Sequence, residues 1–394
     1  MSYSKRSMRR AVGALGLLVA CSAVVASLTG GASASDSPIP HFKVLTAVRP
    51  LPSTSSPVPA SGTPHLKTWS SSVSVGGTNY PFKMVGKKVT TALGSPSTTV
   101  TVPVIPLIIK IGTNTFDPTH LLSGCETATA QTRFKRSPIF DKSTTFTMNG
   151  VNEGATQYVD AFQRAEFDKF TKASGINPGY HVLLKYVQEP AITVTVPAGD
   201  GTTFGSGCSL LGAVEINYFD AFVQNTLFPQ VEASDGVNPA KFPLFLTRSV
   251  VWFDTVTSNC CILGYHGAFN NPDFGGTPQT YSPTDMELSG EFGGGIEDTS
   301  VAAHEVGEWM DDPWGNNPTP LWGHIGQVSG CQGNLEVGDP LTGTNFPDVI
   351  VNGYTYHLQE LAFFSWFYHQ SPSWGAGGKF SNNGTFTTFA ANCP

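Results

Sequence analysis

The chain has 394 residues and a formal net charge of −7, with 22 Lys and Arg residues against 29 Asp and Glu residues. This balance provides no basic footprint for a nucleic acid, so we expect no nucleic-acid partner. Charged residues make up only 13% of the chain, while 42 Gly and 29 Pro residues indicate many turns, a composition typical of loop-rich extracellular proteins.

Residues 1–34 have the organisation of a signal peptide. Four basic residues before position 11 precede an apolar run over residues 11–28, and Ala32-Ser33-Ala34 forms a small-residue cleavage site. We therefore expect a secreted, extracellular protein with no membrane association once the signal is removed. Leu18-Val19-Ala20-Cys21 also resembles a lipobox, so a lipid anchor on Cys21 is an alternative; we favour the later cut, because apolar residues continue past Cys21.

Residues 35–75 are rich in Ser, Pro and Thr, which predicts a linker that buries little apolar surface. Two interpretations stay open for this segment: a spacer, which we favour, and a pro-segment that covers the site until it is cleaved. Residues 76–394 are expected to form one folded domain, long enough to bury a substantial core.

Six cysteines follow the predicted signal peptide, an even number that suggests up to three disulfides in an exported chain. Cys260 and Cys261 are adjacent, and we expect them to bond to different partners. Zinc ligation by cysteines is disfavoured, because the chain has no C-x-x-C pair. The six are Cys125, Cys208, Cys260, Cys261, Cys331 and Cys393.

Hydrophobic periodicity predicts both strands and helices in the first part of the domain. The stretch 99–111 is rich in Val, Ile and Thr and predicts a buried strand, although Pro103 and Pro106 suggest an edge position or a bulge. Further strands are predicted at 181–187, 192–196 and 242–253, and amphipathic helices at 155–172 and 215–228.

Short strands over 250–253, 261–266 and 280–292 are predicted to lead into a helix over residues 297–313. Gly293-Gly294-Gly295 gives the chain room to turn into that helix, and Pro313 cannot continue it. We interpret His266, at the end of the second strand, as a structural histidine rather than a metal ligand.

The predicted helix contains His304-Glu305-Val306-Gly307-Glu308. His304 and Glu308 are four residues apart, so one helix face presents both side chains. An imidazole and a carboxylate in this arrangement, with a third protein ligand, can hold a divalent metal that lowers the pKa of a water toward about 7. Glu305 is then placed to act as the general base. The alternative is that His304 and Glu308 form only a hydrogen-bonded pair and that Glu305 is solvated.

The residues after the helix extend the pattern: Asp312-Pro313, then tryptophans, then Glu336-Val337-Gly338-Asp339. An H-E-x-x-E helix followed by an acidic residue in a turn-rich segment resembles the gluzincin and aspzincin metallopeptidases. The order of the motifs also resembles secreted Exordium-like (phosphate-induced) proteins and their bacterial relatives. The resemblance implies a zincin-like α+β fold with a mixed or antiparallel sheet, whose edge strand lies beside the active-site helix and can bind an extended peptide.

Glu336 is the expected third metal ligand, with Glu360, Asp339 and His324 as alternatives. Glu360 lies in the stretch 357–368, which is apolar almost all round and predicts a buried C-terminal helix. A buried carboxylate must be paired or metal-bound, so Glu360 is expected either to bind the metal or to orient His304. The candidates for stabilising an oxyanion are His324, Tyr354, Tyr356 and His357.

These observations predict a secreted hydrolase of peptides or proteins that uses one Zn²⁺, with His304, Glu308 and Glu336 as ligands and Glu305 as base. One histidine with two carboxylates is an oxygen-rich donor set, so another divalent metal is an alternative. Two other functions stay open: a non-catalytic extracellular or cell-wall binding protein with a structural or vestigial metal site, and a glycosidase. Glu305 and Glu308 on adjacent turns do not face each other across a substrate, which argues against the glycosidase.

Overall fold

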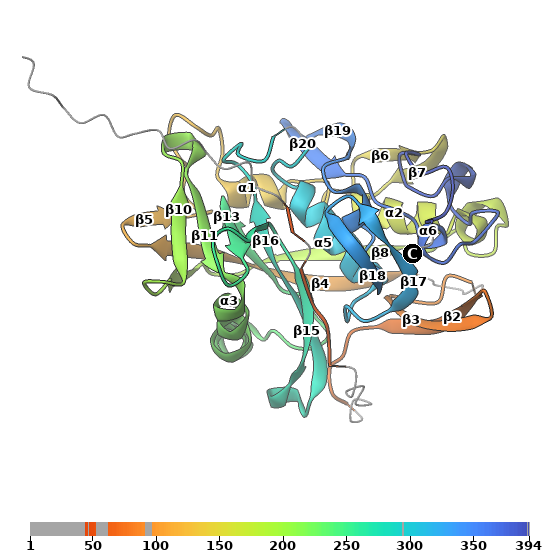
Figure 1. The fold of residues 1–394 in the computed structure, drawn as a ribbon, viewed down its shortest axis with the longest axis horizontal. Coiled ribbons are helices and arrows are strands. Elements are labelled where there is room, and N and C mark those ends of the chain that lie inside the picture. Colours follow the sequence, from red (N-terminus) through yellow and green to blue (C-terminus); the bar gives the residue numbers. More distant parts are fainter. Residues whose placement is uncertain are drawn as a thin grey trace, which may run out of the picture. The chain divides into compact units, whose positions relative to one another are not determined.

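The fold is organised around one long strand, β4 (Thr98–Ile111), in a computed structural model that describes residues 44–45, 47–52, 62–90, 97–293, 295–391 and 393 (Figure 1). Apolar and β-branched residues dominate β4, and most of its side chains are buried on both faces, as expected of a strand inside a parallel sheet. Val104 is in register with Leu244 on one neighbour and Gln188 on another, so β4 has partners on both sides. The expected edge position for Pro103 and Pro106 is therefore wrong.

Eight strands form the main sheet. β4 pairs in parallel with β12, β8 and β9, and β12 pairs in parallel with β16, whereas β15 and β16 are antiparallel. This mixture of directions, with few helices, confirms the expected α+β class. The strand order is β1 (Val48–Arg49), β15 (His266–Asn271), β16 (Thr277–Met286), β12 (Leu244–Arg248), β4 and β5 (Asn114–Phe116), and β8 (Val182–Gln188) and β9 (Ile192–Thr195) also pair with β4.

A second sheet has four strands. The predicted strand 242–253 is divided between the two sheets, and its second half belongs to this one. The chain turns at Ser249, which has a φ of +50°, so that β12 stays in the main sheet and the next strand joins the second one. The order of the second sheet is β10 (Gly201–Phe204), β11 (Leu211–Glu215), β13 (Val250–Phe253) and β14 (Cys260–Ile262).

Four two-stranded hairpins complete the β structure. One of them begins inside residues 35–75, so the structure differs from a linker that ends at residue 75: β2 contributes buried Trp69 and Val73 to the core. Residues 1–43 and 53–61 lie outside the described ranges, and with them the predicted signal peptide. The hairpins are β2 (Thr68–Val75) with β3 (Thr78–Val85), β6 (Thr145–Met148) with β7 (Val151–Ala155), β17 (Pro318–Ile325) with β18 (Val328–Asn334), and β19 (Asn345–Val351) with β20 (Tyr354–Gln359).

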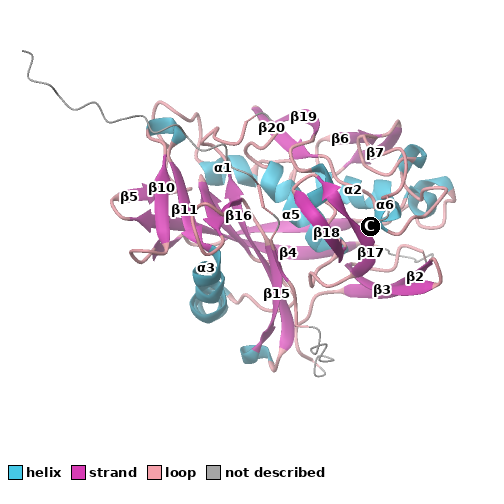
Figure 2. Ribbon diagram, in the orientation of Figure 1, coloured by secondary structure: helices cyan, strands magenta, loops and turns pink. Residues whose placement is uncertain are grey.

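The helices are short and lie between the strands (Figure 2). The predicted helix 215–228 continues further than expected, through α3, a π-helical turn and α4, and the predicted helix 297–313 is α5. All 12 residues of α5 are buried, because α2, β3, β15, β16 and β20 pack around it. The helices are α1 (Ala130–Lys135), α2 (Tyr158–Glu166), α3 (Ile216–Phe222), α4 (Phe228–Asp235), α5 (Ser300–Asp311) and α6 (Phe364–Phe367).

The apolar face of α5 belongs to the larger of the two main hydrophobic clusters. Val306, Trp309 and Met310 are fully buried, and the Trp309 ring stacks on Phe242 with the ring centroids 3.8 Å apart. The second cluster lies between the main sheet and the α3–α4 segment. Burial of α5 on every side fixes its polar residues in place.

The predicted C-terminal helix over 357–368 is wrong in its secondary structure. Its first residues continue strand β20, and only the four residues of α6 are helical. The prediction of burial is confirmed, since residues 358–368 are all buried. Aromatic packing rather than helix periodicity explains the apolar pattern: Phe364, for example, contacts Phe82 and Tyr368.

Three disulfides join the six cysteines, as expected in number: Cys125–Cys208, Cys260–Cys261 and Cys331–Cys393. The expectation that Cys260 and Cys261 bond to different partners is wrong. The four other cysteines pair with one another, so the two neighbours are left to bond to each other.

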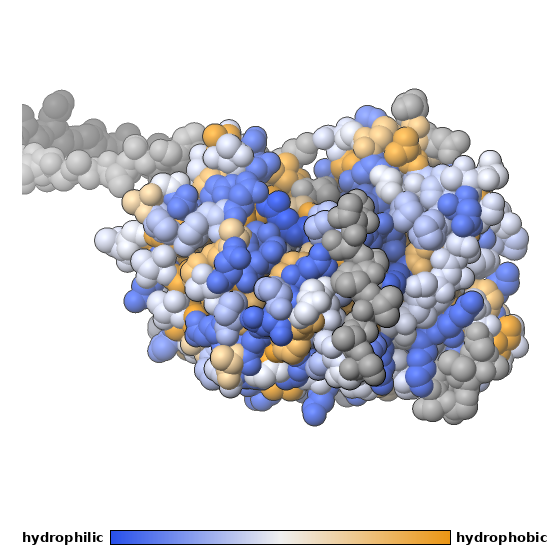
Figure 3. Space-filling view, turned by 90° about the horizontal axis from the view of Figure 1, so that it is seen from below, coloured by the Kyte–Doolittle hydropathy of each residue, from blue (hydrophilic) through white to orange (hydrophobic). Residues whose placement is uncertain are grey.

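The surface of the described residues mixes polar and apolar groups. In the view of Figure 3, apolar residues lie in small groups among hydrophilic ones. None of the helices in the described ranges has the length and apolar character needed to span a bilayer.

Candidate metal centre

Helix α5 presents His304, Glu305 and Glu308 to one buried site. The Nε2 atom of His304 lies 3.0 Å from Oε1 of Glu308, so these two residues are in direct contact, as the hydrogen-bonded alternative expected. The other ring nitrogen, Nδ1, lies 3.1 Å from Oε1 of Gln359 at the end of β20. The amide nitrogen of Gln359 donates to the Gly338 carbonyl at 2.6 Å, which turns its oxygen toward His304. His304 therefore donates from Nδ1 to Gln359.

His266, at the start of β15, lies in the same site. Its Nε2 atom is 3.1 Å from the carbonyl oxygen of Asp312 and must carry a proton to donate to it. The Nδ1 lone pair then faces one carboxylate oxygen, Oε2, of each of three glutamates. The distance from Nδ1 is 3.6 Å to Glu305 and to Glu308, and 3.9 Å to Glu336. A histidine fixed by a carbonyl on one nitrogen and facing acidic side chains with the other has the usual setting of a metal ligand.

Two of these four atoms have no hydrogen-bond partner. His266 Nδ1 and Glu305 Oε2 are buried and unpaired among the described residues. Leaving buried polar atoms unpaired costs free energy, and grouping several carboxylates costs more unless a cation lies among them. The 3.6 Å separations between His266 Nδ1 and the oxygens of Glu305 and Glu308 are too long for hydrogen bonds but close to the roughly 3.4 Å between ligands that each lie about 2.1 Å from one tetrahedral ion. The Glu336 oxygen, 3.9 Å from Nδ1, lies beside this compact group rather than in it. The donor set therefore fits a divalent cation.

The loop after β18 closes the site and explains the sequence Glu336-Val337-Gly338-Asp339. Glu336 points toward His266, while the backbone N–H groups of Gly338 and Asp339 donate to Oε1 of Glu308 at 3.1 and 3.2 Å. Gly338 lies against the His304 ring so closely that a Cβ atom there would be 2.5 Å from the ring. Asp339 adds a carboxylate oxygen 3.6 Å from Nε2 of His304.

The site therefore contains two compact groups of ligand atoms that share Glu308. One is His266, Glu305 and Glu308, with Glu336 beside it; the other is His304, Glu308 and Asp339. In the second group Oε1 of Glu308 already accepts hydrogen bonds from two backbone N–H groups and touches His304 directly. The first group, which holds the unpaired atoms, is the better candidate for a metal.

Burial and mutual repulsion set the protonation of these groups. Burial raises the pKa of Glu336, and the Glu308 carboxylate raises it further. Burial also raises the pKa of Glu305. Burial opposes ionisation of Glu308 too, but the His304 and His266 imidazoles outweigh it and hold the pKa of Glu308 below its ordinary value.

The histidines respond in the opposite sense to the same charges. Burial alone would lower the pKa of His266, but Glu336, Glu305 and Glu308 outweigh it and raise that pKa well above its ordinary value. For His304, burial is likewise outweighed, chiefly by Glu308 and Asp339, and its pKa is raised. Without a metal, a proton on His266 supplies the positive charge that the carboxylates require.

A small cavity of about 30 Å³, open in part to solvent, lies against this group. Of the site residues, His304 and Glu305 line the cavity, together with Gln359. His266, Glu308 and Glu336 lie behind them, at most 2% exposed. A molecule in the cavity therefore meets Glu305 and His304 first. The other walls are formed by Val44, Leu45, Leu263, Gly264, Ile296, Ser300, Val301, Gln327 and Thr342.

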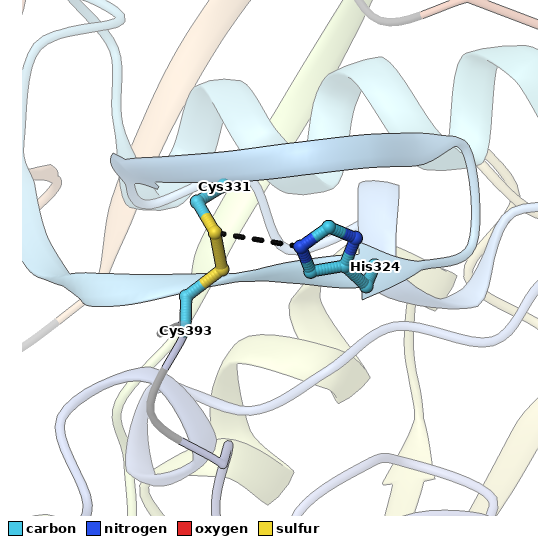
Figure 4. A group of neighbouring side chains, drawn as sticks. All are labelled: His324, Cys331 and Cys393. Carbon is cyan, nitrogen blue, oxygen red and sulfur yellow. Dashed lines mark hydrogen bonds between the residues drawn. A yellow bond between two sulfur atoms is a disulfide. The ribbon is translucent and has the colours of Figure 1, made fainter.

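The other candidate ligands lie in different surroundings. Glu360 is buried but accepts hydrogen bonds from Ser381 at 2.6 Å and Thr385 at 2.7 Å, so the C-terminal segment satisfies it. His324 points toward Cys331 of the Cys331–Cys393 disulfide, 3.6 Å from its sulfur (Figure 4). These three residues are close enough to surround an ion, but disulfide sulfurs are not thiolates and make no such site.

Two members of the site were missed from the sequence. His266 was assigned a structural role because its strand gives no periodic signal for a ligand, and Gln359 was hidden in a stretch expected to be helical. One signal for His266 was available in the sequence. The predicted helix and the loop at 336–339 contain several carboxylates but only one histidine, so a further positively charged group was needed to balance them.

Comparisons of the chain with known protein families, with curated proteins and with solved structures gave no match.

Proposed function

We propose that the chain is an exported metal-dependent hydrolase that cleaves peptide bonds at the cavity beside α5. The observation that supports the proposal most directly is the convergence of His266 Nδ1 with three buried carboxylate oxygens, where Nδ1 and the Glu305 oxygen have no hydrogen-bond partner among the described residues. The proposed metal ligands are His266, Glu308 and Glu336. A zinc ion held there would lower the pKa of a water molecule toward about 7 and polarise a carbonyl group.

Glu305 is the proposed general base. Among the three carboxylates around His266, it is the one that lines the cavity, so it can reach a water molecule that enters. Burial raises its pKa, so Glu305 accepts a proton more readily than an exposed glutamate does. This assignment keeps the role that the sequence predicted for it.

We propose a different role for His304 from the one that the sequence predicted. It binds the oxygen of Glu308 that faces away from His266, and Gln359 holds its other nitrogen. We assign it the role of orienting Glu308 and of presenting positive charge to the cavity, where an oxyanion would develop. His266 then replaces His304 in the ligand set.

Peptides are the proposed substrates because β15, which carries His266, lies near the edge of the main sheet and beside α5. Extended peptides bind to such sheet edges through backbone hydrogen bonds. The oxygen-rich ligand set leaves manganese or another divalent metal as an alternative to zinc.

The test is elemental analysis of the exported protein, purified without chelator and without a histidine tag, beside single variants. We expect about one zinc per chain in the wild type and in Glu305→Gln, and loss of the zinc in His266→Ala and Glu308→Ala. Glu305→Gln should lower peptide turnover by about 10²-fold or more while it keeps the metal. His324→Ala is the matched control, since this histidine lies beside the disulfide and should change neither reading.

Two results would count against the proposal. A folded wild type that takes up no metal when zinc, manganese and other divalent ions are offered would leave a structural helix and favour the extracellular binding protein. A Glu305→Gln variant that cleaves as fast as wild type would show that the base is assigned wrongly.

A further inference from the structure

The cavity beside Glu305 is bordered by the start of the described chain. We define the N-terminal strap as residues 44, 45 and 47–52, which fall inside the segment expected to be a linker. Val44 and Leu45 of the strap line the cavity together with His304 and Glu305. A segment more than 200 positions away in sequence from α5 therefore forms part of the wall of the proposed active site.

Backbone pairing attaches the strap to the strand that carries His266. Val48 and Arg49 form β1, parallel to β15, with Val48 in register with His266 and Arg49 with Gly267. The contacts continue on both sides of β1: Leu45 donates its N–H to the Cys261 carbonyl at 2.8 Å, and Leu51 donates to the Trp314 carbonyl at 2.8 Å. In the sheet order β1 is the terminal strand, so β15 becomes the edge once the strap is removed.

Side chains fit the strap to this edge. Leu51 is 1% exposed, and Leu45 and Ala47 pack on the second hydrophobic cluster. A Cβ atom on Gly267 would lie 2.8 Å from Cβ of Arg49, so the strap approaches β15 at a distance that only glycine permits. Arg49 adds a hydrogen bond to Asn217 at 3.0 Å.

The strap lies beside a groove in the way that an extended peptide lies in its binding site. A groove beside the strap is lined by Leu45 and Val48 on one side and by β18 residues such as Val328 and Gln332 on the other. It shares Leu45 and Gln327 with the cavity at Glu305, so the two hollows lie next to each other. An extended chain in the position of the strap runs from the cavity along β15, with one side chain at the place of Leu45.

We propose that the edge of β15 is the peptide-binding site of this protein and that the strap occupies it as an intramolecular ligand, which makes the intact chain latent. The latency of the intact chain rests on the proposed hydrolase function, whereas the binding of a peptide to the edge of β15 does not depend on that function. The site takes an extended peptide, parallel to β15, with an apolar side chain at the position of Leu45. The surroundings of that position explain the preference, since Leu263, Ile296 and Val301 line the same cavity.

The experiment uses the full exported chain with a recognition sequence for a specific protease placed between residues 53 and 59. Before the cut, the tethered strap is present at a millimolar effective concentration, so a fluorescent peptide of residues 44–52 should not bind at micromolar concentration. After the cut, the strap exchanges with the labelled peptide, and fluorescence anisotropy should show saturable binding. Hydrolysis of a quenched peptide library by the zinc-loaded protein should rise at least tenfold on cutting.

Strap variants provide a second measurement that does not need the cut. Leu45→Asp places a carboxylate next to Glu305 and should release the strap, so the uncut variant should bind the labelled peptide. Ile350→Asp is the matched control, because Ile350 is an exposed apolar residue on β19 and should leave the uncut chain closed.

The outcomes separate the two proposals. Peptide binding after the cut without hydrolysis would support the binding site and contradict the hydrolase. Equal hydrolysis before and after the cut, with no exchange of the labelled peptide and no effect of Leu45→Asp, would show that the strap is a permanent strand and overturn this inference while the hydrolase stands.

Discussion

His266 and His304 touch the same carboxylate but differ in what their second nitrogen does. His304 is bound at both nitrogens, by Gln359 and by Glu308. His266 is hydrogen-bonded at Nε2 alone, and within the described part of the chain its Nδ1 atom has no hydrogen-bond partner. Of the two, His266 is therefore free to accept either a proton or a metal ion, and the two ligands compete for one nitrogen atom.

This competition predicts that zinc binding releases protons. Because Glu336 and the neighbouring glutamates raise the pKa of His266 above its ordinary value, the metal-free protein holds a proton there at pH 7. Zinc must displace this proton, so we expect about one proton to be released per zinc ion bound, and more if Glu336 also ionises. For each proton released, the zinc affinity should rise about tenfold per pH unit.

Calorimetric titration of zinc into metal-free protein, in two buffers of different ionisation enthalpy, counts the protons. His324→Ala is the control, since this histidine lies beside the Cys331–Cys393 disulfide and should keep the release. Binding with no proton release would contradict this prediction, because it would show that zinc displaces no proton from His266.

At the scale of elements, the loop after β18 holds the site through one glycine. Gly338 packs against the His304 ring, and its N–H donates to Glu308. We expect Gly338→Ala to push the loop away from α5, weakening metal binding by about 10- to 100-fold and lowering the free energy of unfolding by about 1–3 kcal/mol.

Gly330→Ala is the matched control for this substitution, because Gly330 lies in β18 with no atom close to where its Cβ would be. Chelator competition measures the affinity and urea unfolding measures the stability. Equal values for the two variants would show that the loop adapts without cost.

How far the sequence predicted these elements depends on whether the signal was local. The strand at 99–111 was predicted from its Val, Ile and Thr content, and the helix around His304 from its H-E-x-x-E motif and from Pro313, so each signal lies within or beside one element. Glu336 and Asp339 were found because they follow that helix closely. His266 required knowledge that β15 packs beside α5, which is a long-range contact without a local pattern. The strap was missed because its apolar residues lie in a segment whose average composition is that of a linker.

At the scale of the whole molecule, a pair of buried carboxyl groups outside the proposed metal site links α2 to α5. Glu166 and Asp311 are fully buried; Gln163 donates to Asp311, and the N–H of Phe364 donates to Glu166. Burial, reinforced by neighbouring carboxylates, raises the pKa of Asp311 to about 8. Burial and the nearby Asp311 raise the pKa of Glu166 as well. The core of the protein thus favours protonated acids.

The raised pKa of Asp311 makes the free energy of unfolding depend on pH. An unfolded chain loses the Asp311 proton near pH 3.8, whereas the folded protein keeps it up to about pH 8. The folded state therefore binds more protons in this range, and stability falls as the pH rises through it, by up to about 1.4 kcal/mol per pH unit for one group. We expect Asp311→Asn to flatten this fall, since the amide keeps the Gln163 contact and cannot ionise.

Urea unfolding of the metal-free protein between pH 5 and pH 8 measures the slope. Asp348→Asn is the control, because Asp348 is exposed and should leave the slope as in wild type. A slope that Asp311→Asn does not change would assign the pH dependence to other buried acids, such as Asp285.

The Cys331–Cys393 disulfide closes a covalent ring around much of the site. Glu336, Asp339 and Gln359 all lie on the chain between these two cysteines. A protease that cuts once inside the ring, for example at the exposed turn between β19 and β20, leaves both pieces joined through sulfur. If the chain is exported as proposed, it can thus be nicked by extracellular proteases in this region without shedding a residue that builds the proposed metal centre.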